Sequence, residues 1–255
     1  MADTHEDAIT LDTLAGSWRI FQLRRGHRFS TDDLLVAWAA VRAQPEARRL
    51  LDLGAGLGSV GLLALWMLPT EAHLTMVEVQ AVSHLLAQRS VAYNGLTERV
   101  RLRLQALQDW PGGSFDLVMG SPPYLPLPQG VHPQHAQKLA ARFELHGTVD
   151  DYCAAAARSL TNTGSFCFCH TADDPRPEPA IVRAGLRLVH RQLIYFRARL
   201  PARLALFTCA WQGGRDDPAP LVIRDRQGRW TAEYLAMREE MGAPAAFLQR
   251  ARSMR

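Results

Sequence analysis

The sequence has few of the features that mark membrane, secreted or metal-binding proteins. No apolar run approaches the roughly 20 residues that a membrane-spanning helix needs, and Met1–Thr10 carries acidic residues in place of the basic and apolar regions of a secretion signal. The four cysteines, Cys153, Cys167, Cys169 and Cys209, lack the paired spacing of a metal site. We therefore expect a cytoplasmic protein with reduced core thiols, no metal and no membrane partner.

Lysine is almost absent as well. Lys138 is the single lysine among 29 basic residues, so arginine carries nearly all of the positive charge. The formal net charge is +4 and the pI is about 9.1. Arginine pairs well with phosphate, and an excess of it favours a polyanionic partner, although charge alone leaves the function open.

What the sequence does contain is a regular alternation of short apolar runs and helical patterns. The apolar runs, which predict strands, are Leu50–Leu53, Leu74–Val79, Val100–Leu104, Phe115–Gly120, Ser165–Cys169, Leu186–Tyr195 and Leu204–Ala210. The helical patterns between them are Ser59–Leu68, Ala81–Asn94, Thr148–Leu160 and Pro179–Ala184. This order predicts a doubly wound α/β fold, with a mostly parallel sheet covered by helices on both faces.

Segments on either side of this alternation predict appendages to a single core. Ser17–Ser30 is expected to be extended or a hairpin, and Asp32–Arg42 a helix with Thr31 or Asp32 as its N-cap. After Trp211 the chain predicts a terminal hairpin and helix. We divide the chain into an N-terminal hairpin and helix (1–48), a core (49–215) and a C-terminal extension (216–255).

The strongest local motif is a glycine-rich turn that follows the buried strand Leu50–Leu53. Gly54, Gly56 and Gly58 let the backbone turn and approach a ligand closely, because they carry no Cβ. A helical pattern begins directly after Gly58. A strand, a glycine turn and a helix in this order are typical of a site that binds a nucleotide-like cofactor.

Two carboxyl groups complete a cofactor site suited to S-adenosylmethionine (SAM). Asp52 falls at the carboxyl edge of the first strand, where it can accept a hydrogen bond from the amino group of a methionine moiety. Glu78 ends the second strand, and a carboxylate there suits the two hydroxyls of a ribose. A dinucleotide fingerprint with Gly56, Gly58 and Gly61 also fits, but its first glycine comes two residues late after the strand. A tight turn that binds nothing is the third interpretation.

The second motif is a rigid turn, Ser121-Pro122-Pro123-Tyr124, at the end of the strand Phe115–Gly120. An exocyclic base amine is a poor nucleophile because its lone pair is delocalised into the ring. If Ser121 Oγ and the Pro122 carbonyl accept its two hydrogens, the lone pair turns toward the methyl donor; the prolines fix both acceptors. Tyr124 is suited to stack on the extruded base, although a loop tyrosine packed on proline is the alternative.

At these residues the chain resembles the bacterial methyltransferases that modify adenine N6 at position 37, beside the anticodon of a valine tRNA. The matching segments are Arg28–Asp32, Leu51–Gly58, Val77-Glu78, Asn94, Phe115–Leu117, Ser121–Tyr124, Arg199–Arg203 and Leu221–Arg224. The resemblance implies a Rossmann-like, seven-stranded SAM methyltransferase fold with the last strand antiparallel. It also implies that Thr31 and Asp32 help to close over the cofactor.

The chain departs from this family at two positions. The family's turn opens with asparagine where this chain has Ser121, and the serine form resembles cytosine-N4 methyltransferases. The aspartate that holds the adenine amino group of SAM corresponds to Ala106 here, with Gln105 or Asp109 as possible substitutes. A protein glutamine N-methyltransferase and a catalytically silent RNA-binding homologue therefore remain as further alternatives.

The resemblance also implies an RNA surface, with tRNA as the expected partner. The arginines that could contact its phosphates are Arg183, Arg187, Arg191, Arg197, Arg199, Arg203 and those ending at Arg255. Each of them could equally belong to an ordinary solvated face. His132, His135 and His146 fall near the expected mouth of the site.

Overall fold

The computed structural model describes residues 8–127 and 131–243. The strands are β1 (Ile9–Ala15), β2 (Trp18–Leu23), β3 (Arg49–Leu53), β4 (His73–Glu78), β5 (Val100–Leu104), β6 (Phe115–Gly120), β7 (Leu160–Thr171), β8 (Arg187–Tyr195), β9 (Leu204–Ala210) and β10 (Leu221–Val222). The helices are α1 (Thr31–Ala43), α2 (Ser59–Met67), α3 (Ala81–Tyr93), α4 (Ala136–Arg142), α5 (Val149–Ala157), α6 (Pro177–Arg183) and α7 (Ala232–Glu240).

The predicted doubly wound fold is confirmed. Within the described residues, the main sheet has the order β10-β8-β9-β7-β6-β3-β4-β5. All of its pairings are parallel except those of β9, which runs antiparallel to both β7 and β8. The sheet has one strand more than the expected seven, because Leu221–Val222 adds to the edge beside β8.

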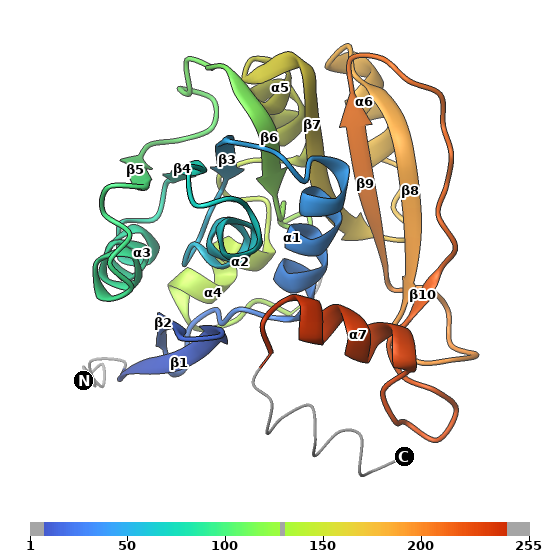
Figure 1. Ribbon diagram of the computed structural model, residues 1–255, viewed down its shortest axis with the longest axis horizontal. Helices are drawn as coiled ribbons and strands as arrows, with labels where there is room; N and C mark the ends of the chain where they lie inside the picture. The colour runs from blue at the N-terminus through green and yellow to red at the C-terminus, as the bar shows by residue number, and fades with distance from the viewer. Residues whose placement is uncertain (1–7, 128–130, 244–255) are drawn as a thin grey trace.

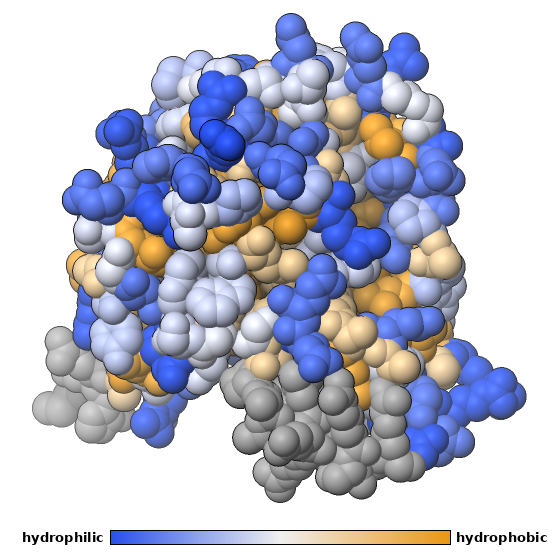
Figure 2. Space-filling view, in the orientation of Figure 1, coloured by the Kyte–Doolittle hydropathy of each residue, from blue (hydrophilic) through white to orange (hydrophobic). Residues whose placement is uncertain are grey.

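Helices cover both faces of this sheet, which explains why its central strands are mainly apolar. In Figure 1, α1 and α2 lie in front of the sheet and α5 and α6 behind it. Leu35 and Leu62 belong to the core in front, and Phe166 and Ala155 to the core behind. On the front face, Figure 2 shows hydrophilic residues along the upper edge and a band of hydrophobic surface across the middle.

Helix α1 begins one residue earlier than expected. The predicted N-cap at Thr31 or Asp32 is wrong: Ser30 is the cap, and its side chain accepts a hydrogen bond from Asp32 N. Asp33 Oδ2 accepts in return from Ser30 N at 2.8 Å, which completes a capping box. With the cap supplied by Ser30, the Asp32 side chain is available for other contacts.

The N-terminal hairpin of β1 and β2 packs on α3. Asn94 fixes it there, because its side chain accepts from Arg19 N at 2.8 Å and donates to Arg19 O at 2.7 Å. The expected hairpin is therefore present, but it begins at Ile9, earlier than the Ser17–Ser30 segment predicts. At the other end of the chain, α7 packs near β10 at the lower edge of the sheet in Figure 1.

Candidate active site

A cavity of about 970 Å³ lies at the carboxyl ends of β3, β4 and β6. These strands are neighbours in the sheet, so the turns that follow them meet at one edge. Residues from the glycine-rich turn and from the proline turn line the same cavity, among them Gly56 and Pro122. The two motifs that the sequence singles out are thus brought together.

The glycine-rich turn has the backbone that its sequence predicts. Gly54, Gly56 and Gly58 have φ values of +60°, +55° and +83°, a region that residues with a Cβ rarely adopt. A Cβ on Gly56 would meet no atom within 4 Å, whereas one on Gly54 would collide with the Tyr152 hydroxyl. Gly54 and Gly56 line the cavity, whereas Gly58 does not line it and is the N-cap of α2.

Asp52 lies under this turn with only 1% of its surface exposed. Its Oδ2 accepts a hydrogen bond of 2.8 Å from Gly61 N, in the first turns of α2. The pKa of Asp52 is raised to about 8, mainly by burial and to a smaller extent by the nearby carboxyl groups of Asp33 and Glu78, while the Gly61 hydrogen bond opposes the rise. Gly61 is the third glycine of the alternative dinucleotide fingerprint. It lies inside helix α2, and its N–H already donates to Asp52.

Glu78 connects the turns that follow β3 and β4. Its Oε2 accepts from Gly56 N at 2.7 Å, and its Oε1 accepts from Gln80 N at 2.7 Å. Burial raises the pKa of Glu78, although these backbone hydrogen bonds oppose the shift. The carboxyl group lines the cavity beside Val79 and Gln80.

The proline turn forms the adjoining wall. Ser121, Pro122, Pro123 and Tyr124 all line the cavity. The Tyr124 hydroxyl donates to Asp32 Oδ2 at 3.1 Å. The Tyr124 ring also packs edge-on against the ring of His170, with 5.3 Å between the centroids. The side chain of Tyr124 is therefore held at both its ring and its hydroxyl.

Asp32 and Asp33 add two more carboxyl groups to the same cavity. Burial raises the pKa of each to about 6; for Asp32 the neighbouring Asp33 adds to the rise, while Tyr124, His27 and Arg203 oppose it. Thr31, the other residue that the resemblance assigns to the cofactor, does not line the cavity. Four carboxyl groups therefore line the cavity, beside four basic residues, Arg28, Lys138, Arg142 and Arg203. The carboxyl groups suit a cationic part of a ligand.

Comparison with known proteins accounts for this arrangement. The model of the methyltransferase small domain family matches residues 33–172, more than half of the chain. The chain belongs to this family. The protein is therefore a methyltransferase with SAM as its methyl donor, as the sequence predicts, and the matched segment contains both motifs.

The relatives and one solved structure extend the comparison. Proteins named tRNA1(Val) (adenine(37)-N6)-methyltransferase match from Mannheimia succiniciproducens, at 27% identity over 82% of this chain and 85% of the relative, and from Escherichia coli O157:H7, at 27% over 82% and 86%. The crystal structure of a predicted O-methyltransferase from Agrobacterium tumefaciens is 20% identical, has a TM-score of 0.60, and covers 84% of this chain and 98% of its own. That structure supports the fold alone.

The sequence does not reveal the role of Cys169 in the methyltransferase. The expectation that Cys167 and Cys169 share one strand face holds, because both belong to the core in front of the sheet. Register brings Cys169 to the proline turn: Gly120 of β6 pairs with Phe168 of β7, and one residue further Ser121 Oγ lies 3.5 Å from Cys169 Sγ. The sequence patterns predict the strands but not which strands pair, and this contact depends on the pairing of β6 with β7.

Gln105 and Leu107, which follow β5, also line the cavity. Of the two substitutes that the sequence offers for Ala106, Gln105 lines the cavity and Asp109 does not. His146 also lines it, whereas the imidazole of His132 packs against the Phe143 ring.

Among residues 8–127 and 131–243, no three His, Cys, Asp or Glu side chains are grouped so that they could hold a metal. None of the helices in those ranges is both long and apolar enough to span a bilayer.

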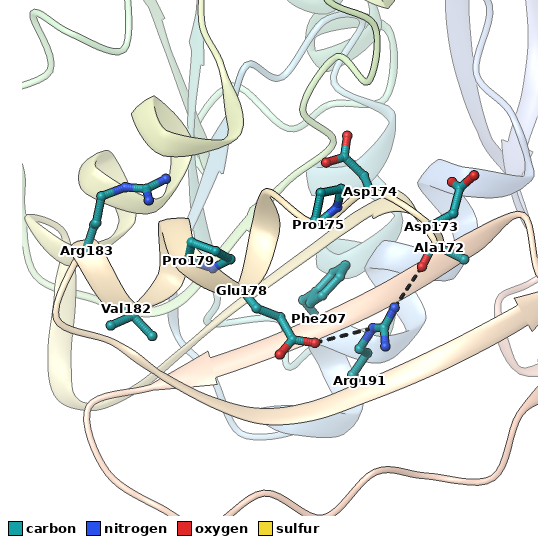
Figure 3. A pocket seen from close by; sticks show the side chains of 10 residues that line it. All are labelled: Ala172, Asp173, Asp174, Pro175, Glu178, Pro179, Val182, Arg183, Arg191 and Phe207. Atoms are coloured by element: carbon teal, nitrogen blue, oxygen red, sulfur yellow. Dashed lines mark hydrogen bonds and ion pairs between the residues drawn. The ribbon is translucent and has the colours of Figure 1, made fainter.

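Three of the arginines expected on an RNA surface line one of two separate pockets. Figure 3 shows Arg183 and Arg191 at a second pocket beside α6, where Arg191 lies between Glu178 and the Ala172 carbonyl. Arg183 pairs with Asp150 at 2.6 Å. Arg203, in contrast, lines the cavity between the glycine-rich turn and the proline turn. The arginines after residue 243 lie outside the described residues.

The segment before Arg203 shapes the mouth of this cavity. Arg199 has a φ of +70°, the one positive value at a non-glycine among the described residues. Leu200 and Pro201 follow it and line the cavity, and 55% of Leu200 is exposed. A strained arginine, an exposed leucine and a proline therefore border the opening.

Proposed function

We propose that the methyltransferase modifies an exocyclic amino nitrogen of a base in tRNA, with adenine N6 at the position named in its relatives as the target. The observation that carries this proposal is the shared cavity: Glu78 and Gly56 form one part of it, and Ser121 and Pro122 the other. A donor site and a site for a planar amine thus adjoin at one sheet edge. The names of the relatives supply the tRNA and the adenine.

The residues present fit SAM. SAM carries positive sulfonium and amino groups, and the cavity contains the carboxyl groups of Asp32, Asp33, Asp52 and Glu78. Asp52 would hold the amino group and Glu78 the ribose, while the open backbone at Gly56 leaves room for the ligand. When bound, SAM supplies an electrophilic methyl group.

The protein's own contribution is to prepare the amine. Ser121 Oγ and the Pro122 carbonyl accept its hydrogens and turn its lone pair toward the donor. The two prolines hold these acceptors without further rearrangement. No strong general base is needed, because the nitrogen becomes acidic once it is methylated. Tyr124 stacks on the base.

The substrate enters past the Arg199–Arg203 segment in this proposal. Arg203 lies at the cavity and is placed to contact a phosphate, and the exposed Leu200 offers an apolar surface to a neighbouring base. Arg183 already pairs with Asp150, and we assign it no phosphate. With tRNA as its substrate, the protein is proposed to act in the cytoplasm.

The test uses purified protein, bulk tRNA and SAM with a labelled methyl group. The RNA is digested to nucleosides and analysed by mass spectrometry, which reports the substrate and the modified atom together. N6-methyladenosine is the expected product. N4-methylcytidine would support the alternative that the serine of the turn favours, in which cytosine is the target.

Two further outcomes would replace the proposal. Label on a glutamine side chain of an added protein, with none on RNA, would indicate the protein-modifying class. Calorimetry with no detectable SAM binding at millimolar cofactor, together with no transfer, would indicate a silent RNA-binding homologue. The control protein is Asp150→Ala, a change on α5 outside the cavity.

A further inference from the structure

A chain of close polar contacts links the proline turn to helix α1. Ser121 Oγ lies 3.5 Å from Cys169 Sγ, and Cys169 Sγ lies 2.9 Å from the Tyr124 hydroxyl. The Tyr124 hydroxyl donates to Asp32 Oδ2 at 3.1 Å. The four groups come from the loop after β6, from β7 and from the first turn of α1. They form a series that ends on a carboxyl group, and Ser121 also lies close enough to Tyr124 to influence its hydroxyl.

Counting hydrogens gives this series a direction. Burial raises the pKa of Tyr124 well above its ordinary value and that of Cys169 to about 12, so both groups keep their hydrogen at neutral pH. Tyr124 has one hydroxyl hydrogen, which goes to Asp32. The contact between Cys169 and Tyr124 therefore requires the thiol to donate. The sulfur can then interact with Ser121 only as an acceptor.

We propose that Cys169 and Asp32 are positioning residues that orient the Ser121 hydroxyl as a hydrogen-bond acceptor toward the target amine. This inference rests on the role proposed above for Ser121. The hydrogen of Ser121 points to the Cys169 sulfur, so the oxygen lone pairs face the cavity. An asparagine amide oxygen has no hydrogen and needs no such control, whereas a serine hydroxyl can present either its hydrogen or its lone pairs.

Protonation of Asp32 reverses the series. A protonated Asp32 donates to Tyr124, Tyr124 donates to Cys169, and Cys169 donates to Ser121. The Ser121 hydrogen is then directed at the amine, whose own hydrogens repel it. The charged and titratable groups that face Asp32 are Asp33 on its own helix, His27 before it, Arg203 before β9, Tyr124 and Cys169. The orienting effect is expected at neutral pH and is lost in acid.

The first experiment removes the thiol. Cys169→Ala is expected to lower kcat about tenfold, the effect of one neutral hydrogen bond, with the KM for SAM unchanged. Cys169→Ser, which can still donate and accept, is expected to restore most of kcat. The matched control is Cys167→Ala, a thiol on the same strand face that contacts Thr208 Oγ1 at 3.6 Å instead. Equal losses in both alanine variants would overturn the inference.

The second experiment replaces Ser121 with a residue whose acceptor oxygen needs no orientation by the hydrogen-bond series. In a Ser121→Asn background, Cys169→Ala is expected to cause less than a twofold further loss of kcat, because the amide oxygen needs no orientation. The acid limb of the kcat profile is expected to weaken in the same background. Additive losses of kcat, or an unchanged acid limb, would contradict the role of the series.

The third experiment does not depend on activity. The S–H stretching band of Cys169, identified as the band lost in Cys169→Ala, reports the strength of the bond that the thiol donates. Tyr124→Phe removes the acceptor and is expected to move this band to higher wavenumber. An unmoved band overturns the inference even if the enzyme methylates tRNA. A moved band in a protein with no transferase activity supports the series and refutes the proposed function alone.

Discussion

Glu78 accepts a hydrogen bond of 2.7 Å from the backbone N–H of Gly56, and so connects the ends of two adjacent parallel strands. The Glu78 carboxyl group therefore stabilises the glycine turn and is also the group proposed to contact the ribose. Burial raises the pKa of Glu78, so ionisation of this carboxyl group carries a desolvation cost that a cationic ligand would offset.

Glu78→Gln is expected to weaken SAM binding about tenfold or more. The amide keeps an oxygen for one backbone N–H but loses the charge and one of the two acceptor oxygens. Isothermal calorimetry measures the change in Kd. Glu71→Gln, an exposed carboxyl group outside the cavity, is the control, and equal affinity in both variants would contradict the assigned contact.

Asp52→Ala is expected to abolish detectable SAM binding. The substitution removes the proposed partner of the amino group and also the acceptor of the Gly61 N–H beneath the turn. Circular dichroism establishes whether the variant is folded. A folded Asp52→Ala protein that binds SAM with wild-type affinity would refute the role of Asp52.

Ser121→Ala is expected to bind SAM normally and to lose turnover, because the proposed contact of the hydroxyl is with the target amine and not with the cofactor. Calorimetry and single-turnover methylation measure the two properties separately. Ser121→Asn is expected to remain active, since the amide oxygen supplies the acceptor. Wild-type turnover by Ser121→Ala would show that the hydroxyl has no role in catalysis.

Asp52 is expected to make the cofactor-free protein less stable as the pH rises. Its pKa is about 8 in the folded protein against 3.8 for an ordinary aspartate, so between these values the folded state holds a proton that the unfolded state has lost. The contribution is complete below about pH 4 and is lost as the pH rises to about 8, at up to about 1.4 kcal/mol per pH unit. The pKa values of Asp32 and Asp33 are also raised, to about 6, so their contributions to stability are lost as the pH rises to about 6.

Urea unfolding of wild-type and Asp52→Asn protein at a series of pH values tests this linkage. The asparagine variant does not titrate, so its stability relative to wild type is expected to increase between about pH 6 and pH 8. A constant difference in unfolding free energy across this range would show that the Asp52 pKa is not raised.

Arg203→Ala is expected to weaken tRNA binding and to reduce the slope of log K against log salt concentration by about one. Arg183→Ala, in which an ion pair with Asp150 is lost, is the matched control and is expected to leave the salt slope unchanged. Filter binding at several salt concentrations gives both slopes. The same decrease in both variants would place the RNA elsewhere.

Much of the architecture was predictable because its signals are local. Val100–Leu104, Phe115–Gly120 and Leu204–Ala210 are strands with the predicted bounds, since continuous apolar or alternating runs stop at turn residues. The start of the hairpin was missed because β1 reverses the usual pattern: Ile9 and Leu11 are exposed, whereas Asp12 pairs with Arg28 at 2.8 Å.

The candidate site likewise contains some positions that the sequence predicted correctly and one that it did not. Gly54 and Gly56 were predictable from the conformations that only glycine adopts readily, and Pro122 from its inability to continue a strand. The N-cap of α1 was predicted wrongly, because Ser30, Thr31 and Asp32 all suit a cap. The capping box between Ser30 and Asp33 decides among them.

The sequence by itself determined the strands, the glycine turn and the proline turn, because each depends on neighbouring residues and on backbone conformations that few residue types tolerate. The tertiary structure alone decided which side chains meet. Tyr124 is 92 residues from Asp32 and 45 from Cys169 along the chain. The pairing of β6 with β7 and the packing of α1 beside them bring these groups into hydrogen-bonding distance. No local pattern encodes such a contact, because strand order arises from the burial of both sheet faces together.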